Sequence, residues 1–126
     1  MSRYRYNYQV IPPAPFAYAS VGAPVEGASS VEFPAQLDTA ADLAVIPWRI
    51  VEELRLSQLG EFEALGLGGH VMTMPTFLVQ IQLRGLAPQV VKVLASPEQP
   101  YILLGRDVLN RFRVTLDGPN LVLEIE

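Results

Sequence analysis

One carboxylate in the chain stands where a side chain could do acid–base chemistry. Asp38 follows the alternating apolar segment 31–37 and precedes three short side chains, those of Thr39, Ala40 and Ala41. The alternation predicts a β-strand that ends at the aspartate. Small residues after the aspartate would allow another backbone to approach its carboxylate closely, and a carboxylate so placed can give or take a proton.

The elements that must position Asp38 are predicted to be mostly short strands. Alternating or continuous apolar segments predict strands at 16–21, 31–37, 76–83, 90–95, 101–104 and, as a terminal hairpin, 112–125. The run 101–104 is continuous, as in a strand that is buried on both faces. Pro47 suits the start of a helix over 48–56, and 106–111 predicts a further turn or two of helix. Roughly eight strands and two short helices indicate a mainly β, barrel-like domain.

A glycine-rich hairpin is predicted before the strand 76–83. The alternating segments 61–65 and 70–74 flank residues 66–69, where three glycines in four residues predict a flexible tip. Such glycines can also cradle a phosphate, but the dinucleotide fingerprint needs a third glycine where Val71 stands, and no Lys-Ser/Thr follows. We therefore reject a phosphate-binding loop.

Size and composition favour one small domain. A chain of 126 residues is long enough for one core and too short for two. Half of its residues are apolar and its mean hydropathy is +0.25, and surplus apolar surface of this kind often forms a subunit interface. Residues 1–13 carry Tyr4, Tyr6 and Tyr8 at period two, which predicts either an edge strand or ordered arm, or a mobile tail; 14–126 form the domain.

The charged and metal-binding residues argue against several classes of function. The net charge is −4 and the nine basic residues form no cluster, which argues against a nucleic-acid partner. Without cysteine and with one histidine, disulfides and thiolate chemistry are excluded and no metal site is expected. No apolar run approaches the roughly 18 residues that span a bilayer, and the N-terminal residues lack the apolar segment of a secretory signal. We expect no cofactor, no membrane partner and a cytoplasmic location.

Three features stand in a fixed order along the chain. The first is Asp38-Thr39-Ala40-Ala41 after an apolar strand, and the second is the hairpin with its glycines at 66–69. The third is an apolar run that leads through glycine into a short helix, Ile102-Leu103-Leu104-Gly105-Arg106-Asp107-Val108-Leu109. This order and spacing resemble the retropepsin-like aspartic proteases across about residues 14–126. The resemblance implies a closed β-barrel with one or two short helices and a flap hairpin over the substrate.

The resemblance also implies a role for each matching position. Asp38 is the expected catalytic carboxylate, and Thr39 is expected to form hydroxyl hydrogen bonds between two active-site loops. Ala40 and Asp42 are expected to line the substrate cleft, with Arg106 paired to Asp42. The active-site loop comprises Thr39, Ala40, Ala41 and Asp42. The flap tip comprises Gly66, Leu67, Gly68 and Gly69. The segment that supports the loop from beneath comprises Leu104, Gly105 and Arg106.

The chemistry of that family needs two carboxylates, and this chain carries one motif. Aspartic proteases use two aspartates that share one proton: the charged one activates a water and the protonated one hydrogen-bonds the scissile carbonyl. Asp42, Asp107 and Asp117 lack the context of the motif. A two-fold homodimer would supply a second Asp38. The resemblance therefore implies a homodimeric aspartic endopeptidase that acts on polypeptide substrates.

Ala40 departs from the pattern of the family. Glycine is usual at this position, and alanine adds a methyl group beside the expected substrate path and loses ready access to positive φ. Ala40 supports one alternative, a catalytically inactive dimer of this fold that acts as an interaction or scaffold module. A further alternative, a small β-barrel that binds a ligand without an aspartate pair, requires the order of the three motifs to be accidental. Cleavage of unfolded protein that is lost in Asp38→Asn would separate the peptidase from both.

Overall fold

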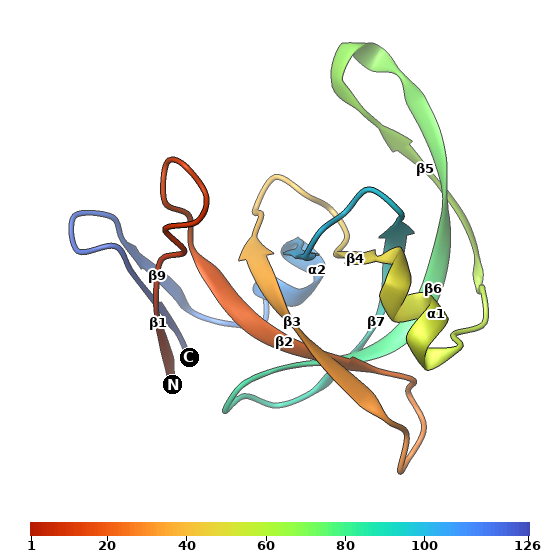
Figure 1. Cartoon of the computed structure of the whole chain (residues 1–126), viewed down its shortest axis with the longest axis horizontal. Helices are drawn as coiled ribbons and strands as arrows, with labels where there is room; N and C mark the ends of the chain where they lie inside the picture. Colours follow the sequence, from red (N-terminus) through yellow and green to blue (C-terminus); the bar gives the residue numbers. More distant parts are fainter.

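A closed β-barrel forms the body of the protein (Figure 1). The computed structural model describes residues 1–126, apart from the side chain of Leu67. Around the barrel the strands follow the order β2-β3-β8-β4-β7-β6, and β6 pairs back onto β2. Their bounds are β2 Phe16–Gly22, β3 Ser30–Leu37, β4 Val45–Pro47, β6 Val71–Leu83, β7 Gln89–Ser96 and β8 Ile102–Leu104. The mainly β class and the closed barrel are confirmed, and a closed ring leaves no free strand edge within it.

Alternation along these strands fills the barrel with apolar side chains. Residues that are at most 2% exposed include Val21, Ile46, Phe77, Val79, Ile81, Leu83, Val93, Ile102 and Leu104. Trp48 is partly buried against this core and meets Phe77 edge-on, with ring centroids 6.0 Å apart. Each large apolar side chain that is fully buried contributes on the order of 1.5–3 kcal/mol. The core thus fixes the strand ends on which the candidate site is built.

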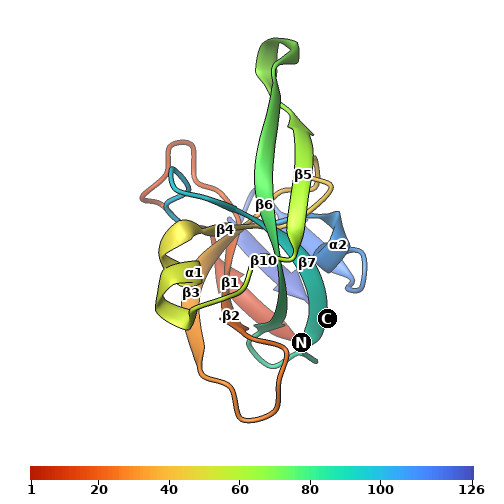
Figure 2. The same cartoon turned by 90° about the vertical axis from the view of Figure 1, so that its right-hand side faces the viewer.

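The hairpin of β5 and β6 extends beyond the barrel. β5, Gly60–Leu65, pairs with β6 alone, and Figure 2 shows the two strands rising away from the body. The segments 70–74 and 76–83, which were predicted as two strands, form one strand of 13 residues that continues through Pro75. Pro75 is tolerated because pairing with β7 begins only at Thr76, so the missing N–H need not break a ladder on both sides.

A second, three-stranded sheet joins the two ends of the chain. β1, Ser2–Arg5, pairs with β10, Val122–Ile125, which also pairs with β9, Val114–Asp117. The N- and C-termini therefore lie side by side (Figure 1). Of the two alternatives for the tyrosine-bearing segment, the structure contains the edge strand. The terminal hairpin predicted over 112–125 is present as β9 and β10.

The helices are shorter than predicted. α1, Trp48–Leu54, begins directly after Pro47 and ends before position 56 because Arg55 adopts left-handed backbone angles, with φ 53° and ψ 47°. α2, Arg106–Leu109, is a single turn that follows β8. The run 101–104 becomes a strand only from Ile102, and Leu103 is half-buried because one face of β8, and not both, points into the barrel. The expectation of burial on both faces was therefore wrong.

Candidate active site

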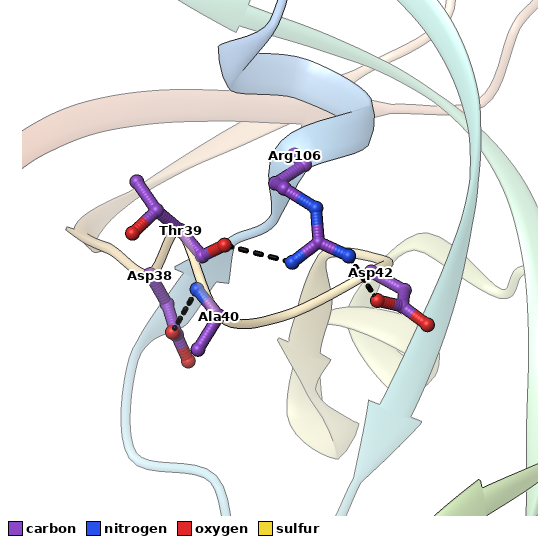
Figure 3. A network of polar contacts seen from close by, with 5 residues as sticks. All are labelled: Asp38, Thr39, Ala40, Asp42 and Arg106. Atoms are coloured by element: carbon purple, nitrogen blue, oxygen red, sulfur yellow. Dashed lines mark hydrogen bonds and ion pairs between the residues drawn. The ribbon is translucent and has the colours of Figure 1, made fainter.

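Asp38 lies at the end of β3, where the chain leaves the barrel. Its backbone N–H donates to the carbonyl oxygen of Leu104 on β8 at 3.0 Å, which extends the parallel β3–β8 pairing by one bond. The Asp38 carboxylate accepts the N–H of Ala40 at 3.1 Å through Oδ1 (Figure 3). The carboxylate is thereby held by its own loop, as in an Asx-turn, and remains half-buried at the surface.

Arg106 fastens the loop that follows Asp38. Its guanidinium donates to the carbonyl oxygen of Thr39 at 2.8 Å and forms an ion pair with Asp42 (Figure 3). Its backbone N–H donates to the carbonyl oxygen of Ala41 at 2.9 Å. Both charged side chains are exposed, so the ion pair itself contributes little to stability. Its effect is geometric, because one planar guanidinium ties two points of the loop to the start of α2.

Gly105 allows the loop and the β8–α2 junction to touch. A Cβ atom at this position would lie 2.6 Å from the carbonyl carbon of Leu43 and 2.9 Å from the backbone nitrogen of Ala44. These are backbone atoms that cannot rotate away, so a side chain would push the loop outward. Together with Leu104 and Arg106, Gly105 supports the Asp38 loop from α2 and β8.

Asp107 is a support that sequence reasoning missed. Its carboxylate accepts the N–H of Ala44 at 3.2 Å, at the end of the loop, and the N–H of Val108 at 2.9 Å. Burial of this half-buried group raises the pKa of the Asp107 carboxyl, while the two N–H donors act in the opposite direction. An acidic residue in the first turn of a helix was the available signal, but nothing in the sequence identified Ala44 as its partner.

Ala40 fits its position without backbone strain. Positive φ occurs outside glycine only at Arg55 and Leu121 in the part of the chain that the structure describes, so Ala40 has an ordinary φ. The side chain of Ala40 is exposed and lines a hollow beside the loop. Alanine therefore changes the shape of this surface and not the path of the backbone.

A hollow of about 400 Å³ separates the loop from the β5–β6 hairpin. The loop contributes Ala40, Ala41, Asp42 and Leu43. The barrel and the hairpin contribute Val45, Phe62, Glu63, Ala64, Leu65, Met74 and Leu94. Most of this lining is apolar; its two charged residues are Asp42, which is paired with Arg106, and Glu63. The hollow can accept an apolar side chain next to the Asp38 loop.

The predicted flap tip follows directly after Leu65, which lines this hollow. Gly66 donates its N–H to the carbonyl oxygen of His70 at 2.8 Å, and Gly68 and Gly69 both have φ of +77°. Glycine at these positions allows the tight turn. The side chain of Leu67, also named for the flap, lies outside the described part of the structure. The strands of the hairpin, and not its glycines, line the hollow.

Thr39 has none of the hydroxyl hydrogen bonds expected of it within the described part of the chain. No hydrogen bond from the Thr39 hydroxyl to another described residue is present, and the Thr39 side chain is exposed. The bonds expected of it between two loops need a second chain.

The described residues contain no cluster of three or more histidine, aspartate or glutamate side chains that could hold a metal ion. None of the described helices combines the length and hydropathy needed to cross a membrane.

The barrel with its flap hairpin is a retropepsin-like fold. Solved structures similar to it include the EIAV protease complexed with the inhibitor HBY-793, which is 20% identical, with a TM-score of 0.58 over 80% of this chain and 89% of that one. The Simian foamy virus (mac) protease is 19% identical, with a TM-score of 0.55 over 76% and 92%. A retropepsin-like aspartic protease from Rickettsia conorii is 14% identical, with a TM-score of 0.61 over 97% and 86%. At these identities the similarity shows a shared fold.

The sequence itself shows the family. The sequence profile described as aspartyl protease matches residues 21–108, which contain the Asp38 loop, the hairpin and the β8–α2 junction. The chain therefore belongs to the aspartyl protease family, and the resemblance derived from its three motifs is confirmed. No curated protein sequence matches it.

Proposed function

We propose that the protein is an aspartic endopeptidase whose active site forms between two copies of the chain, each of which contributes Asp38. The observation that carries this proposal is the way Asp38 is held. Its backbone is fixed to Leu104 and its carboxylate is oriented by the N–H of Ala40, while the loop that follows it, from Ala40 onward, borders a mostly apolar hollow. A side chain that must exchange protons with a bound substrate needs this kind of fixed support.

No other aspartate of the chain is available as the second carboxylate. Asp42 is paired with Arg106. Asp107 is half-buried and accepts two backbone N–H groups at the start of α2. Asp117 lies at the end of β9 and is engaged by Asn120. A two-fold dimer would supply the second carboxylate, because an isologous contact brings the same residue of both copies to the axis.

The reaction needs the two Asp38 carboxylates to share one proton. Two like charges a few ångströms apart cannot both ionise cheaply, so the singly protonated pair persists over the acidic range. The ionised carboxylate takes a proton from water, and the protonated one hydrogen-bonds the carbonyl oxygen of the scissile peptide. The hollow beside Ala40 holds a neighbouring side chain of the substrate and so orients the peptide bond.

Digestion of an unfolded protein at acidic pH tests the proposal. Wild type should cleave it, Asp38→Asn should lose cleavage, and both should sediment as dimers. Asp117→Asn is the matched control, since it makes the same chemical change at an aspartate remote from the loop. Cleavage retained in Asp38→Asn would exclude the mechanism. A wild-type dimer that cleaves no unfolded protein would instead favour the inactive scaffold, for which the methyl group of Ala40 beside the hollow is the structural basis.

A further inference from the structure

A second hollow, lined by aromatic side chains, lies on the side of the barrel away from the flap. It measures about 580 Å³ and runs between β1 with the residues that follow it and the outer surface of β2 and β3. Its aromatic lining consists of Tyr4, Tyr6, Tyr8, Phe16 and Tyr18. Figure 1 shows β1 across the barrel from the β5–β6 hairpin. We call this hollow the tyrosine groove; the proposed peptidase chemistry makes no use of it.

The open edge of β1 borders the tyrosine groove. β1 is the outer strand of its sheet, in the order β1-β10-β9. Tyr4 stands opposite Leu123, and Tyr6 donates its N–H to the carbonyl oxygen of Leu121 at 2.9 Å. Because bonding alternates along an antiparallel pair, the even-numbered residues bond with β10, and the N–H and C=O groups of Arg3 and Arg5 face outward. Four backbone groups are thus free to pair with another extended strand.

The charge along this edge is positive. Arg3 and Arg5 are exposed, and neither takes part in an ion pair among the described residues. Arg3 is partly compensated, since it stands opposite Glu124. Arg5 stands opposite the neutral Val122, so no acidic residue lies directly across from it. A strand added beside β1 would place alternate side chains next to these arginines, where acidic residues fit best.

The other face of such a strand would meet the tyrosines. The rings of Tyr4 and Tyr18 lie 6.4 Å apart, and the guanidinium of Arg84 covers Tyr18 at 4.3 Å from the ring centroid. The hydroxyl of Tyr4 is buried without a hydrogen-bond partner among the described residues. Tyr8 is 58% exposed at the end of the groove. These side chains offer an apolar surface with polar tips.

We propose that the edge of β1 and the tyrosine groove bind an extended polypeptide segment that alternates acidic with apolar or aromatic residues, by β-strand addition. The segment belongs to another protein and not to a second copy of this chain. Two-fold pairing of β1 with itself would set Arg3 of one copy opposite Arg5 of the other, and like charges directly opposite are destabilising. The inference is independent of the proposed peptidase activity.

A labelled peptide tests the proposal directly. The probe is a fluorescent ten-residue peptide that alternates glutamate with valine and tyrosine, and the control peptide has lysine in place of glutamate. Fluorescence anisotropy should show saturable binding of the first and binding at least roughly tenfold weaker for the second. Hydrogen exchange at the amides of Arg3 and Arg5 should slow when the peptide binds, while those of Tyr4 and Tyr6 stay protected throughout. Unchanged exchange at Arg3 and Arg5 would overturn strand addition.

Two substitutions at Arg5 separate backbone pairing from charge. Arg5→Ala removes the charge but keeps the N–H, whereas Arg5→Pro also removes the outward N–H, which proline can do on an edge strand without breaking the ladder to β10. Arg5→Ala should weaken binding several-fold and Arg5→Pro weaken it further, with unchanged circular dichroism. Equal binding by both variants and wild type would reject the site. Dissociation of a wild-type dimer by Arg5→Pro, without peptide binding, would assign the groove to a second copy and also overturn the proposal.

Discussion

The Asp38 loop and the β5–β6 hairpin face each other across one hollow, yet they are held in different ways. The loop, residues 38–44, is tied to β8 and α2 by Leu104, Arg106 and Asp107, all distant in the sequence. Beyond the barrel the hairpin is held mainly by pairing between its own two strands. The ammonium group of Lys92 on β7 lies 5.9 Å from the ring centroid of Phe62. Leu65 and Val71 near the tip are 76% and 63% exposed. A reacting group must stay fixed, whereas a cover must open to admit substrate.

The largest effect is expected where the loop is most tightly enclosed. Gly105→Ala would place a methyl group 2.6 Å from the carbonyl carbon of Leu43. Forced overpacking of this kind costs about 1–3 kcal/mol, and we expect the upper half of that range because backbone must move. Urea denaturation measures the loss. Gly118→Ala, with nothing within 4 Å of the added methyl, should stay within about 0.5 kcal/mol of wild type. Equal stability of the two variants would refute the tight enclosure.

A substitution in the hairpin should act locally and change the global stability of the protein little. Gly69→Ala places a methyl group at φ of +77° with no atom nearby, which costs about 1–2 kcal/mol locally. Because the hairpin opens separately from the barrel, the free energy of global unfolding should change less, while hydrogen exchange at 66–69 and peptide turnover both change. Gly27→Ala has the same φ and equally open surroundings in a remote loop, so it is the matched control. A change in peptide turnover with Gly27→Ala would show that backbone strain outside the hairpin also alters turnover, and would contradict a specific role for the hairpin.

Ala40→Gly tests the exposed side of the loop. Since Ala40 has an ordinary φ, the glycine variant should be less stable by about 0.4–1 kcal/mol, through the greater freedom of its unfolded chain. Removal of the methyl from the hollow should raise turnover or broaden the accepted substrates. Thermal unfolding and peptide cleavage, measured on the same preparation, test both parts. A variant that is more stable than wild type would contradict the backbone conformation described above.

The smallest effect concerns the pH dependence of stability. The folded pKa of Asp107 is raised by burial, so its contribution to stability is complete below the unfolded pKa of about 3.9 and is lost as pH rises through the higher folded value. Asp107→Asn should remove this fall. Asp117, whose pKa is lowered by Asn120, should act with the opposite sign, so Asp117→Asn should remove a gain in stability with rising pH. Urea denaturation at pH values from 3 to 7 measures both effects. If the free energies of unfolding of the two variants change with pH at the same slope, this assignment is wrong.

Much of the barrel could be predicted from local pattern, because alternation reports which side of a strand is buried. Segments 31–37 and 90–95 agree with β3 and β7 to within one residue. The pairing of residues far apart could not be predicted in the same way. The tyrosine segment was compatible with a strand or a tail until β10 supplied its partner. Asp107 carries no local sign that its carboxylate bonds Ala44, 63 residues earlier.

The site was predictable only as far as its motifs reached. The Asp38 loop and the β8–α2 junction lie together because β3 and β8 are adjacent and parallel. The resemblance carried by the order of the three motifs implied this placement. The hollow beside Ala40 depends on how Phe62, Met74 and Leu94 converge from three strands. Such convergence follows from the curvature of the barrel and from side-chain packing, neither of which a linear pattern contains.

The distance in sequence between Asp38 and its supports has a consequence for synthesis of the chain. The bonds from Leu104, Arg106 and Asp107 span more than sixty residues, and contacts of such long range form late. A nascent chain that stops short of residue 104 already contains Asp38 and the complete hairpin, but it lacks the groups of β8 and α2 that hold the loop. The proposed peptidase site would therefore stay incomplete in growing chains on the ribosome until the barrel has closed.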